Sequence, residues 1–406
     1  MGPDVVRIFW GRGIRGFADG FVSVLLAGYL TALGFSPIKV GAIVTGTLIG
    51  SAILTLMLGL SAHRLPIRTL LLAACGLMAA TGVGFATVTW FWPLFVIAVV
   101  GTLNPSSGDV SVFLPTEQAF LADQVDAADR PRVYARYNLT AIWASAIGAL
   151  LSALPEVLAR HYDWDIASTY RAAFTVYIAA ALAIALIYRG LPRAEADMAP
   201  IARKPLRTSR RIVLELAALF SLDAAGSGFV VTSLLVLWLH LRFDLSAATT
   251  GEVFFVAALL AASSQMLAPR LAKRFGLIRT MVFTHIPANG LLILAAFAPN
   301  GAIAIGLLLA RALFAQMDVP ARQAFVMAVV PSDERAAAAS VTNVPRSLAS
   351  ATTPLLAGVL LSHSSFGWPL VIAGTMKAAY DVALLLLYRS VPEEEGARRE
   401  RTTRAP

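Results

Sequence analysis

The chain has few of the residues on which soluble enzymes and secreted domains depend. Only 14% of its 406 residues are charged, against about a quarter in an average soluble domain. The one cysteine, Cys75, excludes an internal disulfide and gives no sign of thiolate metal chemistry. The five histidines stand far apart, as His63, His161, His240, His285 and His363. No phosphate-binding loop of the Gly-x-x-x-x-Gly-Lys type occurs. We therefore expect no enzyme activity, no metal and no cofactor. We also expect that ATP hydrolysis does not directly drive whatever work the protein performs.

Long apolar runs take the place of these groups. Hydrophobic residues make up 58% of the chain, and the mean hydropathy is +0.72. Stretches near 20 residues, enough to cross about 30 Å of hydrocarbon as helix, recur along the chain. They are continuous and do not alternate, so they predict helices and not barrel strands. We predict an all-α membrane protein with twelve transmembrane helices, at about 7–33, 38–60, 68–88, 92–121, 134–157, 169–189, 212–239, 249–271, 279–298, 301–329, 337–361 and 367–388.

One six-residue sequence motif, the repeated phrase, occurs twice, half a chain apart. Pro115–Phe120 reads Pro-Thr-Glu-Gln-Ala-Phe and Pro320–Phe325 reads Pro-Ala-Arg-Gln-Ala-Phe, and the spacing holds to Asn138 and Asn343. Gly20-Phe21 likewise matches Gly228-Phe229. The repeat predicts two pseudo-symmetric six-helix bundles, a known transporter plan with the substrate near the bilayer midplane. Within the repeated phrase, the first half has Glu117 where the second has Arg322.

Basic residues mark one side of the membrane. The connection between the sixth and seventh helices is rich in arginine, and alternate loops on the same side hold most of the remaining bases. The net charge of +9 is therefore a topology signal and not a nucleic-acid surface. We expect a multi-pass monomer in the plasma (inner) membrane with both termini in the cytoplasm. Its expected parts are a bundle at 1–190, a cytoplasmic linker loop at 191–211, a second bundle at 212–389 and a disordered tail at 390–406.

The loop between the second and third helices resembles the hallmark loop of the major facilitator superfamily. That pattern runs glycine, three residues, an acid, a base, one residue, glycine and further bases. The positions that carry the resemblance are Gly59, Arg64 and Arg68, with His63 in place of the acid, and Arg274 and Gly276 in the second copy. Tyr29–Ser36 looks like the first-helix exit of drug and metabolite efflux members. The resemblance implies a central cavity lined by helices one, four, seven and ten.

Most of the charged residues deep inside the predicted helices fall on those same four helices. An Arg or Asp at mid-membrane costs roughly 2.5–3.5 kcal/mol, so it normally faces a cavity or a partner. Arg311, Asp318 and Arg322 share one face of helix ten. The proposed proton-coupling and cavity set is Arg15, Asp19, Asp109, Asp223, Arg311 and Asp318. Asp19 and Asp223 are the first candidates for protonation, because a low-dielectric cavity favours the neutral acid, and Glu117 and Asp318 are the runners-up.

Plainer alternatives exist for several of these groups. Arg15 with Asp19, four residues apart, and Lys377 with Asp381 form structural pairs in this reading and only neutralise one another. His285 is then a buried hydrogen-bonding residue rather than a proton relay.

A second hypothesis concerns the cytoplasmic end of the cavity, where Glu117 and Arg322 pair as a gate. Asn138, Asn343 and Arg346 supply polar contacts nearby.

The leading functional hypothesis is a secondary transporter that moves a small organic solute by alternating access. Proton-coupled efflux by antiport is favoured, with protons, the solute and the lipid bilayer as partners and no nucleic acid. Solute uptake by symport is the alternative, and a transporter-like sensor or a lipid flippase is a third. A membrane-embedded enzyme is disfavoured, because it needs clustered histidines and carboxylates that the chain lacks.

Overall fold

The computed structural model describes residues 2–61, 66–105, 113–125, 130–192, 209–330 and 334–388. Within these ranges the chain forms sixteen helical segments and no strand, which confirms the all-α prediction. His63, Arg64, Asp109, most of the linker loop and the tail lie outside the described residues.

Ten described helices are long and apolar enough to cross a membrane, counting α6 and α7 as one. Two pairs of shorter segments, α4 with α5 and α13 with α14, account for the two other predicted spans. The first half contains α1 (Pro3–Ala32), α2 (Pro37–Ser61), α3 (Ile67–Thr87), α4 (Phe91–Val100), α5 (Phe113–Gln124), α6 (Arg130–Leu151), α7 (Leu154–Tyr162) and α8 (Ile166–Tyr188). The second half contains α9 (Arg210–Phe229), α10 (Thr232–Phe243), α11 (Ala247–Phe275), α12 (Leu277–Ala296), α13 (Gly301–Ala312), α14 (Asp318–Val329), α15 (Arg335–His363) and α16 (Trp368–Tyr388).

Four predicted spans are each divided into two helical segments. Proline explains two of the breaks, because it lacks the N–H that an interior helical turn requires but is tolerated in a first turn. Pro155 stands in the first turn of α7 and Pro320 in the first turn of α14. The break between α9 and α10 occurs at Val231, whose backbone is extended.

Local chemistry also explains where several helices begin. The Asp165 carboxylate accepts a hydrogen bond from the Ser168 amide at 2.8 Å and caps α8. That backbone hydrogen bond holds the pKa of the Asp165 carboxyl below its ordinary value. Gly276 precedes α12 with φ of 86°, a conformation that glycine adopts without strain. The glycine of the second hallmark loop is therefore required by the backbone turn between α11 and α12.

The described chain divides into two compact units. Unit 1 comprises Met1–Ala199, Val230–Leu259 and Ala351–Trp368, and unit 2 comprises Pro200–Phe229, Leu260–Ser350 and Pro369–Pro406. Unit 1 thus holds the expected first bundle together with the ends of some second-half helices. The boundaries expected at residues 190 and 212 stay a prediction.

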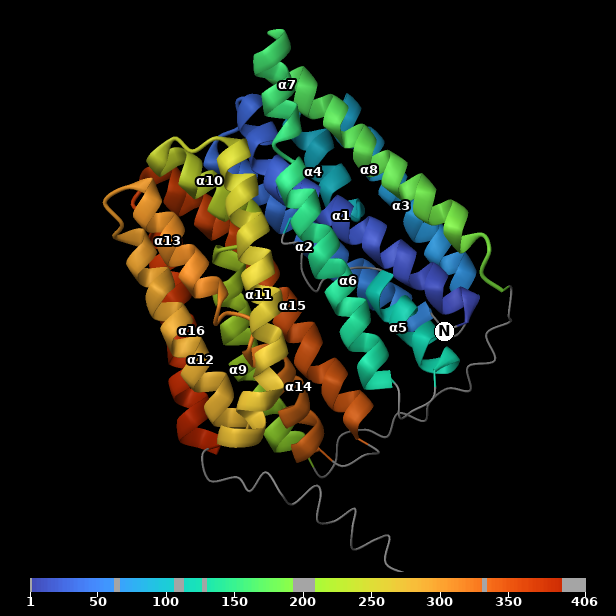
Figure 1. Ribbon diagram of the computed structural model, residues 1–406, viewed down its shortest axis with the longest axis vertical. Coiled ribbons are helices and arrows are strands. Elements are labelled where there is room, and N and C mark those ends of the chain that lie inside the picture. Colours follow the sequence, from blue (N-terminus) through green and yellow to red (C-terminus); the bar gives the residue numbers. More distant parts are fainter. Residues whose placement is uncertain are drawn as a thin grey trace, which may run out of the picture. The chain divides into compact units, whose positions relative to one another are not determined.

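In unit 1, α1 lies between α6 and α8, and α3 packs along α8 (Figure 1). Aromatic rings fill the end of the bundle where α1 finishes. Tyr29, Phe85 and Phe174 lie within ring-contact distance of one another. The Tyr29 hydroxyl also donates to the Phe85 carbonyl at 2.8 Å. This contact ties the end of α1 to α3.

Second-half helices join unit 1 at the end of α1 remote from Met1. The Ser233 hydroxyl donates to the Ser23 carbonyl at 2.7 Å. Gly41 and Gly358 pass so close that a Cβ on Gly41 would stand 3.0 Å from the Gly358 Cα. A Cβ on Gly251 would likewise stand 2.6 Å from the Ala149 carbonyl oxygen. Glycine at these crossings lets backbones from the two sequence halves meet directly.

Glu156, on α7, adds a charged contact at the same end of unit 1. Its Oε2 accepts hydrogen bonds from the backbone amides of Ala247 and Ala248, at 2.7 and 3.3 Å. These amides open α11, so the carboxylate caps a helix N-terminus from the other sequence half. Arg160 contacts the second carboxylate oxygen of Glu156.

Unit 2 is built around a continuous apolar core. Leu216 and Phe220 of α9 pack with Met281 of α12, Phe325 of α14 and Tyr380 of α16. These four helices and Ala338 of α15 therefore form one core, and buried charges lie among them.

Candidate functional site

The buried charges of unit 1 centre on an ion pair between α1 and α5. Arg15 holds both carboxylate oxygens of Glu117, with Nη2 to Oε2 at 2.9 Å and a second contact from Nη1 to Oε1. Both side chains are buried. Bidentate arginine–carboxylate pairs are strong and directional. The pair therefore fixes α5 against α1 inside the unit.

Two tyrosines complete the environment of Glu117. The Tyr188 hydroxyl donates to Oε1 at 2.6 Å, and the Tyr137 hydroxyl donates to Oε2. The Arg15 guanidinium also lies over the Phe113 ring, 4.6 Å from its centroid. Glu117 thus takes one cation and two hydroxyl donors from three helices. Both carboxylate oxygens of Glu117 are therefore fully occupied by donors.

Asp19 lies one helical turn beyond Arg15 and is only 6% exposed. The side chain of Asn104 is hydrogen-bonded to its carboxylate. The ion pairs found among the described residues give Asp19 no cationic partner, because Arg15 is taken by Glu117. Asp19 is therefore a buried acid without a paired cation in the part of unit 1 that the structure describes.

The buried charges of unit 2 centre on Asp223 of α9. Lys377 of α16 reaches its Oδ1 at 2.7 Å, and Arg322 of α14 reaches its Oδ2 at 3.2 Å. Arg322 also lies 3.3 Å from Asp318. Asp223 is thus neutralised twice, in contrast to Asp19.

A second carboxylate, Asp381, lies in the same network of unit 2. The His285 Nδ1 lies 2.9 Å from its Oδ1, and the Asn289 amide donates to its Oδ2 at 2.9 Å. The opposite ring nitrogen of His285, Nε2, lies 3.9 Å from Asp223. His285 is therefore buried and hydrogen-bonded, as predicted.

The expected pairs within single helices are not the pairs that form. Arg15 takes Glu117 instead of Asp19, and Lys377 takes Asp223 instead of Asp381. The i,i+4 spacing places such residues on one helical face, but a partner on a neighbouring helix can lie closer than one on the same helix. The prediction that these i,i+4 neighbours pair was wrong, because each cation pairs with a carboxylate on another helix.

The sequence repeat contained a signal for the pairs that do form. Arg15 is equivalent in the repeat to Asp223, and Glu117 is equivalent to Arg322. The structure pairs Arg15 with Glu117 in one unit and Asp223 with Arg322 in the other. The two halves therefore carry equivalent ion pairs with the charges exchanged. If the contact between the two positions is kept in both halves, a change in the sign of the charge at one position requires the opposite change at the other.

The remaining predicted residues occupy varied environments. Asn138 and Asn343 are exposed, Arg346 and Arg311 are half-buried, and Asp318 is buried. Among the hallmark residues, Arg68 is half-buried and Arg274 is exposed. Gly59 lies within α2. Sequence reasoning missed four residues that contact the buried carboxylates, namely Asn104, Tyr137, Tyr188 and Asn289.

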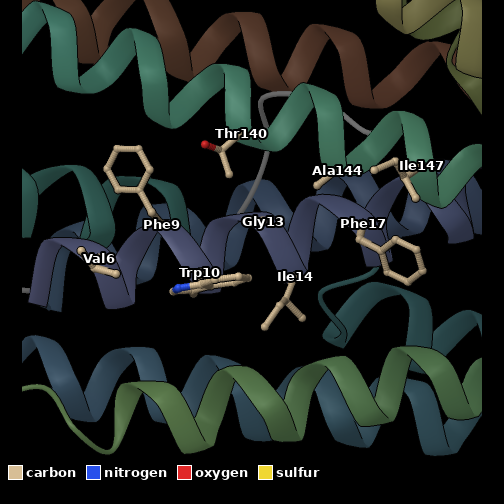
Figure 2. Close-up of a pocket in the computed structure, with 9 residues that line it drawn as sticks. All are labelled: Val6, Phe9, Trp10, Gly13, Ile14, Phe17, Thr140, Ala144 and Ile147. Carbon is tan, nitrogen blue, oxygen red and sulfur yellow. The ribbon is translucent and has the colours of Figure 1, made fainter. Parts of the chain in front are cut away.

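An apolar cavity of about 540 Å³ lies against the face of α1 opposite Arg15 and Asp19 (Figure 2). Six residues of α1 and three of α6 line it, namely Val6, Phe9, Trp10, Gly13, Ile14, Phe17, Thr140, Ala144 and Ile147. The polar groups among these nine are the indole N–H of Trp10 and the hydroxyl of Thr140, which donates to the Arg136 carbonyl at 3.0 Å. Helical periodicity separates this stripe from Arg15 and Asp19. The cavity therefore offers nothing that would bind a charged solute.

Spanning helices with charges buried between them define a polytopic membrane protein of the transporter class. Residues 8–314 and 224–406 match the Major Facilitator Superfamily, and the chain belongs to this family of membrane transporters. An uncharacterized membrane protein of Saccharomyces cerevisiae is 24% identical over 425 residues, covering 95% of this chain and 94% of the yeast protein.

Solved structures show the same fold. A D-xylose-proton symporter matches with a TM-score of 0.75 and 17% identity, over 97% of this chain and 99% of the symporter. The nucleoside transporter NupG matches with a TM-score of 0.68 and 11% identity, over 96% and 100%. A bacterial homologue of the iron transporter ferroportin, in an inward-facing state, matches with a TM-score of 0.71 and 13% identity, over 94% and 98%.

Proposed function

We propose that the protein is a secondary transporter that exports a small organic solute in exchange for protons, with Asp19 as the proton-binding carboxylate. The observation that carries the proposal is the buried Asp19 carboxylate, whose neighbouring arginine is already paired with Glu117. An ionisable residue inside a membrane segment is costly and is usually kept for function. An acid with no paired cation among the described residues is the one whose charge a single proton removes most readily.

Two further observations support this proposal. A proton symporter is among the proteins of similar fold, and its proton coupling is compatible with a similar role here. The resemblance of Tyr29–Ser36 to the first-helix exit of efflux members favours export. The arginine-rich loops favour a plasma (inner) membrane protein with both termini in the cytoplasm.

Transport in proteoliposomes tests direction and coupling together. A stabilisation screen on the purified protein first selects a solute, because a bound ligand raises apparent stability by mass action. An antiporter accumulates that solute when the vesicle interior is the more acidic side, whereas a symporter accumulates it when the exterior is. Equilibration that ignores the pH gradient would contradict proton coupling. No solute movement under any gradient would favour a sensor.

We further propose that Glu156 is a latch that keeps the outer end of the transporter closed. An anion at a helix N-terminus is worth up to about 2 kcal/mol when partly buried. Glu156→Ala is therefore expected to raise the open population at this end by roughly 3- to 30-fold. The measurement is the rate of maleimide labelling of Ser233→Cys, which is buried in the closed end, in a Cys75→Ala background. Glu252→Ala on the exposed face of α11 is the matched control. Equal labelling rates in Glu156→Ala and the control would exclude the latch.

We propose that the cytoplasmic gate forms when Glu117 leaves Arg15 and Arg322 leaves Asp223. Glu117 and Arg322 then pair with each other. A direct charge reversal is a poor test of this exchange. Glu117→Arg would place a second cation beside Arg15, and Arg322→Glu would place a second carboxylate beside Asp223. Asn138 and Asn343 are exposed and equivalent in the repeat, so they offer a cleaner probe.

Asn138→Cys with Asn343→Cys is expected to cross-link when the cytoplasmic end closes, because a disulfide needs Cα atoms within about 7 Å. Cross-linking in a Cys75→Ala background should stop transport, and reduction should restore it. The Glu156→Ala variant should cross-link faster, because it favours the state open at the opposite end. Asn138→Cys with Thr375→Cys, an exposed position on α16, is the matched control. Cross-linking at equal rates in both pairs would count against the gate.

A further inference from the structure

His285 in unit 2 lies between two carboxylates that both accept hydrogen bonds. Its Nδ1 is 2.9 Å from Asp381 on α16, and its Nε2 is 3.9 Å from Asp223 on α9. All three side chains are buried. A neutral imidazole has one N–H, so it can donate to only one of the two acids. Its other nitrogen then turns a lone pair toward a carboxylate, which leaves a place for one more proton.

The surrounding charges are balanced before that proton arrives. The carboxylates of the network are Asp223, Asp318 and Asp381, and its cations are Arg311, Arg322 and Lys377. Neutral His285 therefore adds nothing to a network of zero net charge, and a proton on its ring makes the network positive by one. Two adjacent carboxylates stabilise that added charge.

Two buried polar atoms beside His285 have no hydrogen-bond partner in the described chain. They are the Tyr380 hydroxyl and the Oδ1 of Asn289. The Tyr380 ring lies 6.2 Å from the His285 ring, and Asn289 shares Asp381 with His285. Buried polar groups of this kind are usually satisfied by internal water. Water at this position would give His285 a route for proton exchange.

We infer that Asp381, His285 and Asp223 form a second proton-binding site, in unit 2 and separate from Asp19. A proton from water adds to the free ring nitrogen of His285 and gives the imidazolium. The imidazolium keeps its N–H to Asp381 and turns its second N–H toward Asp223, where it competes with Lys377 for the same carboxylate oxygen. A third cation beside Asp223 weakens its hold on Lys377. The use of this site in transport rests on the proposed function, but the binding of the proton does not.

A variant that keeps His285 as the last histidine makes its protonation measurable. The variant is His63→Gln, His161→Gln, His240→Gln and His363→Gln, of which the last three are exposed in the structure. Full-length protein carrying ¹⁵N-labelled histidine is titrated by NMR, and the ring nitrogen signals report the protonation form directly. The titration covers about pH 5–8, and His285 is expected to gain a proton reversibly as the pH falls.

The same background with Asp381→Asn tests the role of the neighbouring acid. Loss of that negative charge is expected to weaken proton binding at His285 by about tenfold or more. Asp244→Asn, an exposed acid outside the network, is the matched control and should leave the titration unchanged. A ring that keeps one protonation form across this pH range would overturn the inference. Asp19-dependent transport would survive that result, so the two proposals fail separately.

Discussion

Asn in place of Asp19 is expected to abolish solute accumulation driven by a pH gradient, while solute binding and gradient-free exchange stay measurable. The amide keeps the size and the hydrogen-bonding capacity of the acid but cannot take up a proton. Asp19 has no paired cation among the described residues, so its loss strands no partner. The variant should therefore fold normally, and the measurement is concentrative uptake in proteoliposomes.

Asp4→Asn is the matched control for this experiment. Asp4 lies on the same helix but pairs with Arg7 near its exposed start. Its replacement should leave accumulation unchanged. Accumulation that persists in Asp19→Asn would remove Asp19 from the mechanism, whatever the control shows.

Removing one partner of the Arg15–Glu117 pair is expected to produce the largest loss of stability. The partner left behind is a buried charge, and such a charge costs about 3–5 kcal/mol. Arg15→Gln and Glu117→Gln should each lower the unfolding temperature in detergent sharply. The double variant should recover most of the loss, because it leaves no stranded charge.

Arg211→Gln provides the comparison for that stability experiment. Arg211 pairs with Glu215 but is 93% exposed, and exposed pairs are worth under about 1 kcal/mol. A double variant no more stable than the worse single variant would show that the two residues do not act as a pair. Single variants as stable as Arg211→Gln would show that the pair is solvated.

The spans and the repeat could be predicted because both are properties of the sequence itself. Hydropathy counts residues along one helix, and the repeated phrase aligns the two halves directly. The breaks within spans were harder to predict. Pro155 and Pro320 marked two of them, but the extended Val231 gave no comparable signal.

The partners of the buried charges depend on how neighbouring helices are rotated, which spacing along one helix does not record. Lys377 was therefore assigned to Asp381, four residues away, although Asp223 on another helix lies closer. Aligning the helices of the two halves through the repeat gives part of the information on which charged residues pair between helices. The exchanged charges at Arg15 with Asp223 and at Glu117 with Arg322 are the example.

Proton-coupled transport is tested most directly by measuring solute and protons in the same vesicles. Proteoliposomes carry a pH indicator inside, and a solute from the stabilisation screen is added outside without an imposed gradient. If the protein exchanges solute for protons, solute entry drives protons out and raises the internal pH with the wild-type protein, and Asp19→Asn gives no pH change. Solute entry with no proton movement in the wild-type protein would contradict proton-coupled transport.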